Sequence, residues 1–309
     1  MTGWLVANAF LRSEKFDDLY RLLIDAFRAQ GDNLELYPNS AFASPVDEFP
    51  RPRGAAGRPD FVLFWDKDVA LARCFEDAGL RVFNTSSAIA VCDDKIKTAL
   101  AFARCGVPAP RTIFAPMTFD GVERDASGFL HEAAERLGLP MVVKTACGSF
   151  GHGVHLAGTL AEAEDIVRGI GCRDFLVQEF VSTSRGEDLR VNVVGGEVVA
   201  SMRRFNRSDF RSNVTLGGGT EPCEPSHEQR EAALAACRAT GTDFAGVDIL
   251  FGQDGAPLVC EVNSNPHFRS TLDCTGVNLA GPIARHVRKN LQTSRNVNVS
   301  SARSPQDAE

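Results

Sequence analysis

The chain has 309 residues, of which 44% are hydrophobic and 24% charged, and its formal net charge is −7. This composition is typical of a globular protein with room for two or three compact units. A nucleic-acid groove needs clustered lysines and arginines, and the chain has no basic run, so we expect no nucleic-acid partner. No apolar stretch approaches the ~20 residues of a membrane-spanning helix, so we expect no membrane partner either.

The cysteines and the first residues indicate the compartment. Nine cysteines are scattered along the chain without a Cys-x-x-Cys pair, which argues against a disulfide framework and against zinc. The N-terminal residues lack the basic segment of a signal peptide and are typical of a strand instead. We therefore expect a cytoplasmic protein with reduced thiols.

The first ninety residues alternate predicted strands and helices, which is typical of a small doubly wound α/β domain. A proline-rich loop that reaches Pro59 interrupts the pattern. In chain order we expect strand 3–9, helix 16–30, strand 33–37, strand 61–65, helix 69–78 and strand 80–83.

The pattern changes after residue 90 to a mixture of strands and helices, which predicts an α+β domain over residues 91–290 with subdomains of about 91–180 and 181–290. The last residues, 291–309, are polar and aperiodic, and we expect a disordered tail there. Strands are expected at 141–144, 174–178, 187–194, 197–203, 245–251 and 257–263, and helices near 95–104, 160–169, 227–240 and 276–289.

Two acidic strands near the C-terminus flank Asp254-Gly255, a strong hairpin-turn signal. A two-residue loop there places Asp248 across from Glu261, and Gly246 across from Asn263. Strand alternation then assigns six residues to the buried face of the hairpin: Val247, Ile249, Phe251, Leu258, Cys260 and Val262.

Carboxylates that face each other destabilise a sheet, so a cation is expected between them. Two carboxylates and an amide oxygen suit Mg²⁺, which prefers oxygen ligands and usually keeps water and substrate phosphates in its shell. The hairpin therefore predicts a magnesium site at Asp248, Glu261 and Asn263. A surface hairpin with solvated carboxylates is the alternative that the hairpin alone leaves open.

A glycine-rich segment, 148–153, follows the predicted strand that ends at Lys144. Glycines let backbone N–H groups approach an anion closely, and the lysine adds a positive charge. The lysine precedes the glycines, so the segment is not a Walker A loop. A glycine-rich hairpin turn without a ligand is the alternative.

Charged residues next recur inside and after apolar strands. Arg190 lies within an otherwise apolar strand and is expected to point into a cleft, where it could hold a carboxylate or a phosphate. A local surface pair with Asp188 is the alternative. Farther along, Asn213 could orient phosphates, and Arg204 and Arg211 could neutralise transferred charge, unless this segment is a solvated basic loop.

The order of these motifs resembles the ATP-grasp superfamily, and within it the RimK-like carboxylate–amine (alpha-L-glutamate) ligases. The resemblance covers about residues 1–290 and is most specific at 209–213, 244–250 and 261–263. It implies an ATP-grasp fold preceded by a pre-ATP-grasp α/β domain. By the same resemblance, ATP would be bound by Lys95, Lys144, Glu179, Phe180, Asp188, Arg211, Ser212 and Asn213, and Mg²⁺, or Mn²⁺ in its place, by Asp248, Glu261 and Asn263.

The implied activity is ATP- and Mg²⁺-dependent ligation of a carboxylate to an amine through an acyl phosphate, with glutamate or another amino acid as one substrate. Arg190, Arg204 and Arg211 are expected to act on the reacting groups. The expected partners are small-molecule or peptide substrates, and a homo-oligomer is left open. The alternatives are an ATP-grasp kinase, another small-molecule ligase, or a nucleotide-binding regulator without catalytic activity.

Two departures from the family pattern fall on the acceptor side of the expected site. The segment 214–218 lacks the arginine that the type member has before its glycine pair, and Asn263 is followed by Ser-Asn-Pro-His-Phe. These departures put the identity of the substrates in doubt and not the use of ATP. His267 could contact or deprotonate the amine, or it could cap the turn at Pro266.

Overall fold

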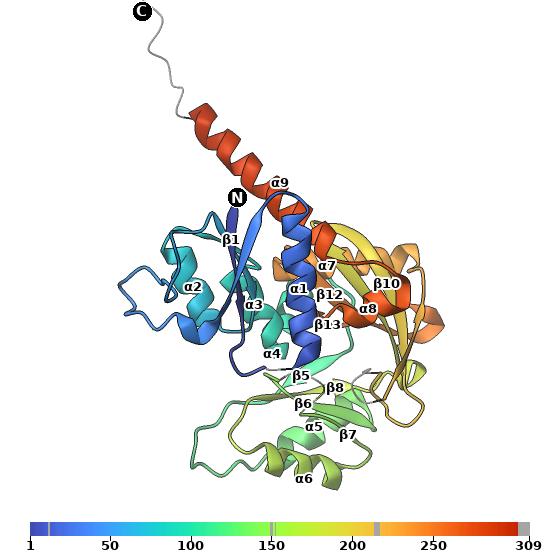
Figure 1. Cartoon of the computed structure of the whole chain (residues 1–309). Helices are drawn as coiled ribbons and strands as arrows, with labels where there is room; N and C mark the ends of the chain where they lie inside the picture. The colour runs from blue at the N-terminus through green and yellow to red at the C-terminus, as the bar shows by residue number, and fades with distance from the viewer. Residues whose placement is uncertain (12, 149–150, 152, 213–216, 302–309) are drawn as a thin grey trace, which may run out of the picture.

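The computed structural model describes residues 1–301 except 12, 149–150, 152 and 213–216, with side chains up to residue 293. The described strands form three sheets. Figure 1 shows the four-stranded antiparallel sheet and its helices as a separate body below the other two sheets. The expected combination of a doubly wound α/β unit with an ATP-grasp-type α+β unit is confirmed.

The N-terminal sheet is parallel, as its strand–helix alternation predicts. Its two central strands, β1 and β3, are buried on both faces, one face packing on α1 and the other on α2, which is why they are continuous apolar runs. Its elements are β1 (Thr2–Ala7), α1 (Glu14–Arg28), β2 (Asn33–Pro38), η1 (Asn39–Ala41), β3 (Phe61–Trp65), α2 (Val69–Asp77), β4 (Arg81–Phe83) and α3 (Ser86–Asp93), with the strand order β2-β1-β3-β4.

The smaller antiparallel sheet follows α4 (Lys95–Cys105), whose N-terminus is capped by the Asp94 side chain. A hydrophobic cluster packs one face of this sheet against its two helices. The elements are β5 (Thr112–Phe114), α5 (Ser127–Leu137), β6 (Met141–Thr145), β7 (Val154–Ala157), α6 (Leu160–Ile170) and β8 (Phe175–Glu179), with the strand order β5-β8-β6-β7.

The larger antiparallel sheet carries most of the residues singled out in the sequence. Helix α7 packs on one face, and α8 lies near the other face beside β10 and β11. The elements are η2 (Ser182–Ser184), β9 (Glu187–Val194), β10 (Glu197–Phe205), β11 (Gly219–Pro222), α7 (His227–Thr240), β12 (Phe244–Phe251), η4 (Gln253–Gly255), β13 (Pro257–Asn263) and α8 (Arg269–Thr275), with the strand order β11-β10-β9-β12-β13.

The predicted register of the acidic hairpin is confirmed at the predicted metal ligands, since Asp248 pairs with Glu261 and Gly246 with Asn263. The predicted two-residue loop is wrong, because the last pair is Phe251 with Pro257 and η4 fills the loop. The pairing of Asp248 with Glu261 is nevertheless the predicted one, because a β-bulge adds one residue, Cys260, to β13 between this pair and the pair of Ile249 with Val259.

The bulge also changes which residues of β13 are buried. Val259 lies in the core under α7, in place of the predicted Leu258 and Cys260, which are half-buried. The extra residue shifts the alternation by one position, so Cys260 lines the cleft on the other face.

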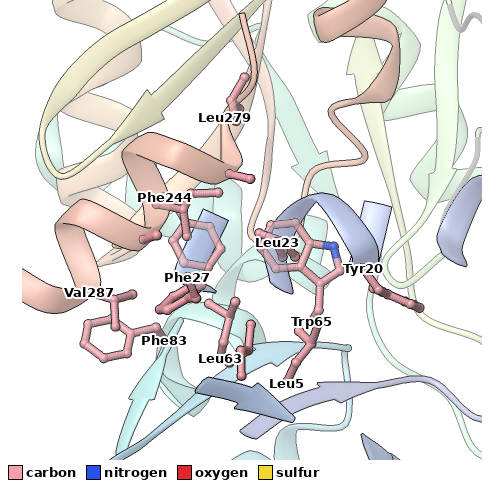
Figure 2. Close-up of a cluster of buried hydrophobic side chains, with 14 of the residues drawn as sticks. Leu5, Tyr20, Leu23, Phe27, Leu63, Trp65, Phe83, Phe244, Leu279 and Val287 are labelled. Atoms are coloured by element: carbon pink, nitrogen blue, oxygen red, sulfur yellow. The ribbon is translucent and has the colours of Figure 1, made fainter. Parts of the chain in front are cut away.

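The last helix, α9 (Ala280–Ser301), joins the N-terminal domain to the rest of the chain. Figure 2 shows Val287 of α9, Phe27 of α1, Phe83 of β4 and Phe244 of β12 in one hydrophobic cluster. The Trp65 ring stacks on Phe244 with 5.3 Å between the centroids. The N-terminal domain therefore shares a core with the larger sheet and the last helix.

The sequence predicts a disordered tail from residue 291, but in the structure α9 continues to Ser301. Ile283, Ala284 and Val287 are buried and fix the first turns of the helix, and adding turns to a formed helix costs little compared with starting one. Residues 302–309 lie outside the described part of the chain.

Asn84 joins the N-terminal domain to the larger sheet by four hydrogen bonds. Its Nδ2 donates to the carbonyl oxygens of Phe244 at 2.9 Å and Ser264 at 2.5 Å. Its Oδ1 accepts from the backbone N–H groups of Asp243 at 2.6 Å and Phe244 at 3.3 Å. Because Asn84 is fully buried, these contacts fix the start of β12 and the chain just beyond β13.

Candidate active site

One face of the larger sheet gathers six of the predicted site residues. Strand alternation turns their neighbours Leu189, Val247 and Val262 into the core under α7, so the charged and polar side chains lie on the opposite face. They come from four strands: Asp188 and Arg190 of β9, Arg204 of β10, Asp248 of β12, and Glu261 and Asn263 of β13.

Four of these side chains form one buried ion-pair network. Arg190 lies opposite Asp248 and donates to both of its carboxylate oxygens, with 3.0 Å between Nη2 and Oδ2. Arg204 Nη2 lies 3.0 Å from the same Oδ2. Arg204 also makes two hydrogen bonds to Asp188, one of them 2.7 Å between Nε and Oδ1. The side chains are only 7–11% exposed, so solvent screens these charges little.

The network shifts the pKa values of two of its members, Arg204 and Asp248. Burial alone would lower the pKa of Arg204, but Asp188 and Asp248 outweigh it, and the pKa of Arg204 is raised. Burial alone would raise the pKa of Asp248, but Arg190 and Arg204 outweigh it, and the pKa of Asp248 is lowered. Arg204 and Asp248 are therefore both charged at neutral pH.

Asp248 thus has cationic partners without a metal ion. The facing carboxylates of Asp248 and Glu261 predict a cation between the two strands, but Arg190 and Arg204 already provide the counter-charge on the other side of Asp248. The hairpin pattern by itself therefore does not require a metal ion. Among the described residues no hydrogen bond or ion pair reaches the Glu261 carboxylate.

The three predicted metal ligands fit Mg²⁺ in their chemistry, because two carboxylates and an amide supply only oxygen donors. Asn263 donates from Nδ2 to the Gly246 carbonyl oxygen at 3.3 Å, which leaves its Oδ1 for a ligand. Asp248 is the exception, because both of its oxygens accept from guanidinium groups. Within the described residues no cluster of three or more His, Cys, Asp or Glu side chains could hold a metal ion.

Two lysines lie near Glu261 of the larger sheet, one on β6 of the smaller sheet and one at the start of α4. Lys144, at the end of β6, is buried and donates from Nζ to Gln178 Oε1 at 2.6 Å, and its Nζ lies 3.6 Å from Cys260 Sγ. Lys95, the first residue of α4, donates to the carbonyl oxygen of Gly148 in the glycine-rich segment at 3.3 Å.

Both lysines line a narrow cavity together with Glu261 and Cys260. Its volume is about 20 Å³, which is room for about one water molecule. A nucleotide is far larger than this space. It can bind there only if the residues that line the cavity move apart.

Three other predicted ATP contacts are not among the residues that line this cavity, and each has protein partners. Glu179 accepts a hydrogen bond from the backbone N–H of Arg111 at 2.8 Å. Phe180 is half-buried with its ring edge-on to Phe210, 6.3 Å between the centroids. Arg211 binds Asp209 through both carboxylate oxygens and donates to the Gly151 carbonyl oxygen at 2.9 Å.

Arg211 therefore ties the segment after β10 to the glycine-rich segment and lies outside the buried ion-pair network. Ser212, which follows it, is buried. Asn213 lies outside the described residues, as does most of the segment 214–218, where the chain departs from the family pattern.

His267 contacts the N-terminal domain. Its Nε2 lies 3.1 Å from the Lys15 carbonyl oxygen, and its ring meets Phe16 edge-on at 5.3 Å. Burial lowers the pKa of His267, so the ring is neutral at pH 7 and the N–H at Nε2 is the donor to Lys15. This contact favours a role in joining α1 to the chain beyond β13 over a role as a base.

Sequence reasoning missed two residues that line the cleft, Gln178 and Cys260, and the pairing of Asp248 with arginines. Gln178 is next to the predicted Glu179, and alternation along β8 could have placed it beside Lys144. Cys260 could not have been found, because its orientation depends on the bulge.

Comparisons with known proteins agree with this architecture. A family model described as the RimK-like ATP-grasp domain matches residues 92–287. A protein named probable alpha-L-glutamate ligase, from Thioalkalivibrio sulfidiphilus, is 35% identical over 296 residues, covering 89% of this chain and 93% of that protein.

Solved structures share the fold at lower identity. The RimK domain ATP-grasp protein from Sphaerobacter thermophilus superposes with a TM-score of 0.70 at 23% identity, covering 93% of this chain and 99% of that one. The ATP-grasp ligase PsnB, in complex with a precursor variant, Mg and ADP, has a TM-score of 0.66 at 20% identity, covering 93% and 97%.

The three-sheet fold, the family model and the relative at 35% identity define an ATP-grasp enzyme, an ATP-dependent ligase that joins a carboxylate to an amine. The chain belongs to the RimK-like ATP-grasp family. Enzymes of this class use ATP and Mg²⁺ and act on small-molecule or peptide substrates. Within the described residues no helix has the length and apolar character needed to cross a membrane.

Proposed function

We propose that this enzyme joins the amino group of an amino acid, with glutamate as the first candidate, to the carboxylate of a peptide or small molecule through an acyl phosphate. The name of the relative that matches 89% of the chain at 35% identity supports glutamate. The observation that carries the proposal is the pair of lysines, Lys95 and Lys144, facing Glu261 of the acidic sheet across one cavity.

Lys95 and Lys144 are suited to hold the phosphates of ATP, because in the described structure their ammonium groups contact only neutral atoms. The carboxylate of Glu179 already accepts a hydrogen bond from the backbone N–H of Arg111. The adenine would therefore meet the Glu179 backbone and the Phe180 ring. Asp188 would act on the nucleoside through Arg204, its buried partner. Arg211, Ser212 and Asn213 would line the phosphate end.

Asp248, Glu261 and Asn263 are the residues that would hold Mg²⁺, whose contribution when bound is to neutralise charge on the transferred phosphoryl group. Mn²⁺ offers the same preference for oxygen ligands and is proposed as a substitute. Arg190 and Arg204, on the same face, would hold the substrate carboxylate and its acyl phosphate, a role that their guanidinium groups suit.

The proposed reaction has two steps. An oxygen of the substrate carboxylate attacks the γ-phosphorus of ATP, and the bond from that phosphorus to the bridging oxygen breaks to release ADP. The amine nitrogen then attacks the acyl carbon, the bond to the phosphate oxygen breaks, and the nitrogen loses a proton. The products are an amide, ADP and inorganic phosphate.

Substrate choice is proposed to lie where the N-terminal domain meets the chain beyond Asn263. Asn84 holds the Ser264 carbonyl oxygen, and His267 contacts Lys15 at the start of α1. Both contacts fall in the segment that departs from the family pattern. A change of acceptor is therefore expected to follow from changes at this junction.

The test is ADP release from Mg-ATP with glutamate and other amino acids, each paired with a panel of peptides and small carboxylates, and mass spectrometry of the products. ADP that requires two partners, with a product at their summed mass minus water, supports the ligase and names its substrates. ADP formed with one carboxylate alone would favour the kinase. ATP binding without ADP under every pairing would favour the regulator.

The cellular setting is also a proposal. All nine cysteines are free in the structure, which supports a reducing compartment such as the cytoplasm. Whether copies of the chain associate is to be settled by measuring the mass of the protein in solution.

A further inference from the structure

Arg190 lies where the predicted metal ligands converge. It donates to both oxygens of Asp248 from the neighbouring strand. Its guanidinium also lies over Gly246, because a Cβ atom at Gly246 would be 2.9 Å from Arg190 Nη1. Gly246 pairs with Asn263, the third predicted ligand. The guanidinium therefore binds one of the three residues that would hold the metal ion, Asp248, and lies over the strand partner of another, Asn263.

A guanidinium and a divalent cation cannot both bind Asp248 at close range without strong repulsion, because the site is almost closed to solvent. The two arginines and the two aspartates of the network already sum to zero charge. Both oxygens of Asp248 accept hydrogen bonds from guanidinium groups. One guanidinium must therefore give up its contact if a metal ion is to coordinate this carboxylate.

The two arginines differ in how firmly they are held. Arg204 keeps two hydrogen bonds to Asp188 if it loses Asp248. Arg190 has Asp248 as its only ion-pair partner among the described residues. Arg190 is therefore the group that leaves, and Arg204 the group that stays.

We propose that Arg190 occupies the metal side of Asp248 in the free enzyme, and that the metal–nucleotide complex displaces it toward the substrate. The displaced guanidinium then binds the carboxylate or phosphate that reacts. Binding is consequently ordered, with the metal–nucleotide complex first and the oxyanion second. This inference rests on the proposed function only in assigning the metal to Asp248, Glu261 and Asn263.

The first test measures metal binding without turnover. Mn²⁺ is titrated into the protein with a non-hydrolysable ATP analogue, and free Mn²⁺ is read by electron paramagnetic resonance. Arg190→Met removes the competing cation, so its Mn²⁺ affinity is expected to be about tenfold higher than that of the wild type, within the usual range of coupling between ligands. Arg190→Lys keeps the charge and is expected to stay near the wild type.

Arg203→Met is the matched control. Arg203 lies on the other face of β10, pairs with Glu187 and is 40% exposed, so its removal should leave Mn²⁺ affinity unchanged. Thermal melting and circular dichroism confirm that each variant is folded. Unchanged or weaker Mn²⁺ binding in folded Arg190→Met would overturn the inference.

The second test measures the order of binding with inorganic phosphate as the oxyanion, by calorimetry. Wild-type enzyme loaded with Mn²⁺ and ADP is expected to bind phosphate about tenfold more tightly than enzyme without them, and Arg190→Met should lose this gain. Equal affinity in the loaded and free wild type would contradict the ordered scheme. Neither test uses an amino-acid substrate, so failure to find an amide product would count against the proposed function alone.

Discussion

The two sides of the proposed nucleotide cleft hold their cations in different ways. On one side, Lys144 of the smaller sheet and Lys95 of α4 contact a glutamine oxygen, a thiol and a backbone carbonyl. On the larger sheet, Arg190 and Arg204 are bound by Asp248 and Asp188. The two lysines have no anionic partner among the described residues, so their charge is available to an incoming polyanion. The charges of Arg190 and Arg204 are balanced by Asp248 and Asp188 until another cation binds these carboxylates.

The same difference predicts where stability and binding come from. Breaking a compensated buried ion pair leaves a bare charge and costs stability. Removing a lysine with neutral partners removes ligand binding and leaves no charge behind. Four changes test this contrast.

The largest effect is expected from Glu261→Ala, which removes the carboxylate that lies at the junction of the two sides. Mg²⁺-dependent ATP turnover should fall by about 10³-fold or more, since charge stabilisation at the transferred group is lost. The fold should be retained, because no described residue forms a hydrogen bond or an ion pair with the Glu261 carboxylate. Turnover measured beside Glu221→Ala, an exposed carboxylate on β11, provides the check. Full activity in Glu261→Ala would show that the carboxylate of this hairpin does not belong to the metal site.

Arg204→Met should give the largest loss of stability. The substitution leaves Asp188 without a cationic partner in a buried site, and breaking such a pair costs about 3–5 kcal/mol. Unfolding in urea measures the loss, with Arg203→Met on the opposite face as the control. A loss below about 1 kcal/mol would show that the arginine side is not held as a compensated network. Asp188→Ala is expected to destabilise for the same reason, in addition to weakening nucleotide binding.

Lys144→Met should show the opposite behaviour. Loss of a charged hydrogen-bond donor worth about 1.5–3 kcal/mol predicts nucleotide affinity lower by about 10- to 100-fold. Stability should be unchanged or slightly higher, because a buried ammonium with neutral partners is no longer required. Nucleotide titration and urea unfolding are compared with Lys289→Met, an exposed residue of α9. A large loss of stability in Lys144→Met would show that this lysine, like Arg204, is needed to hold the fold, and would contradict the contrast between the two sides of the cleft.

The smallest effect is expected from pH. The lowered pKa of Asp248 means that its stabilisation is complete above its unfolded-state pKa, about 3.9, and is lost as pH falls through the folded value. The melting temperature of the wild type minus that of Asp248→Asn should be constant from about pH 5 to 8 and should narrow below about pH 4. A difference that already shrinks near pH 6 would show that Asp248 is not held by the arginines.

The sequence predicted most of the site because its signals are local. Alternation along β9 and β13 gives the faces of Asp188, Arg190 and Asn263, and the hairpin pairs Asp248 with Glu261. The partner of Asp248 on its other side could not be predicted, because β9 lies 58 residues earlier and its register against β12 is a tertiary property. The bulge before Cys260 and the continuation of α9 were missed because both depend on packing.

The cluster shared by the first sheet and the last helix has a consequence for synthesis. Leu5, Phe27 and Phe83 leave the ribosome long before Ile283 and Val287, which complete the same core. One face of the first sheet is therefore incompletely covered until the chain is nearly finished. Contacts so distant along the chain form slowly, because a long loop must close before they contribute. The nascent N-terminal domain is thus a natural client for chaperones, and fragments that end before α9 should aggregate.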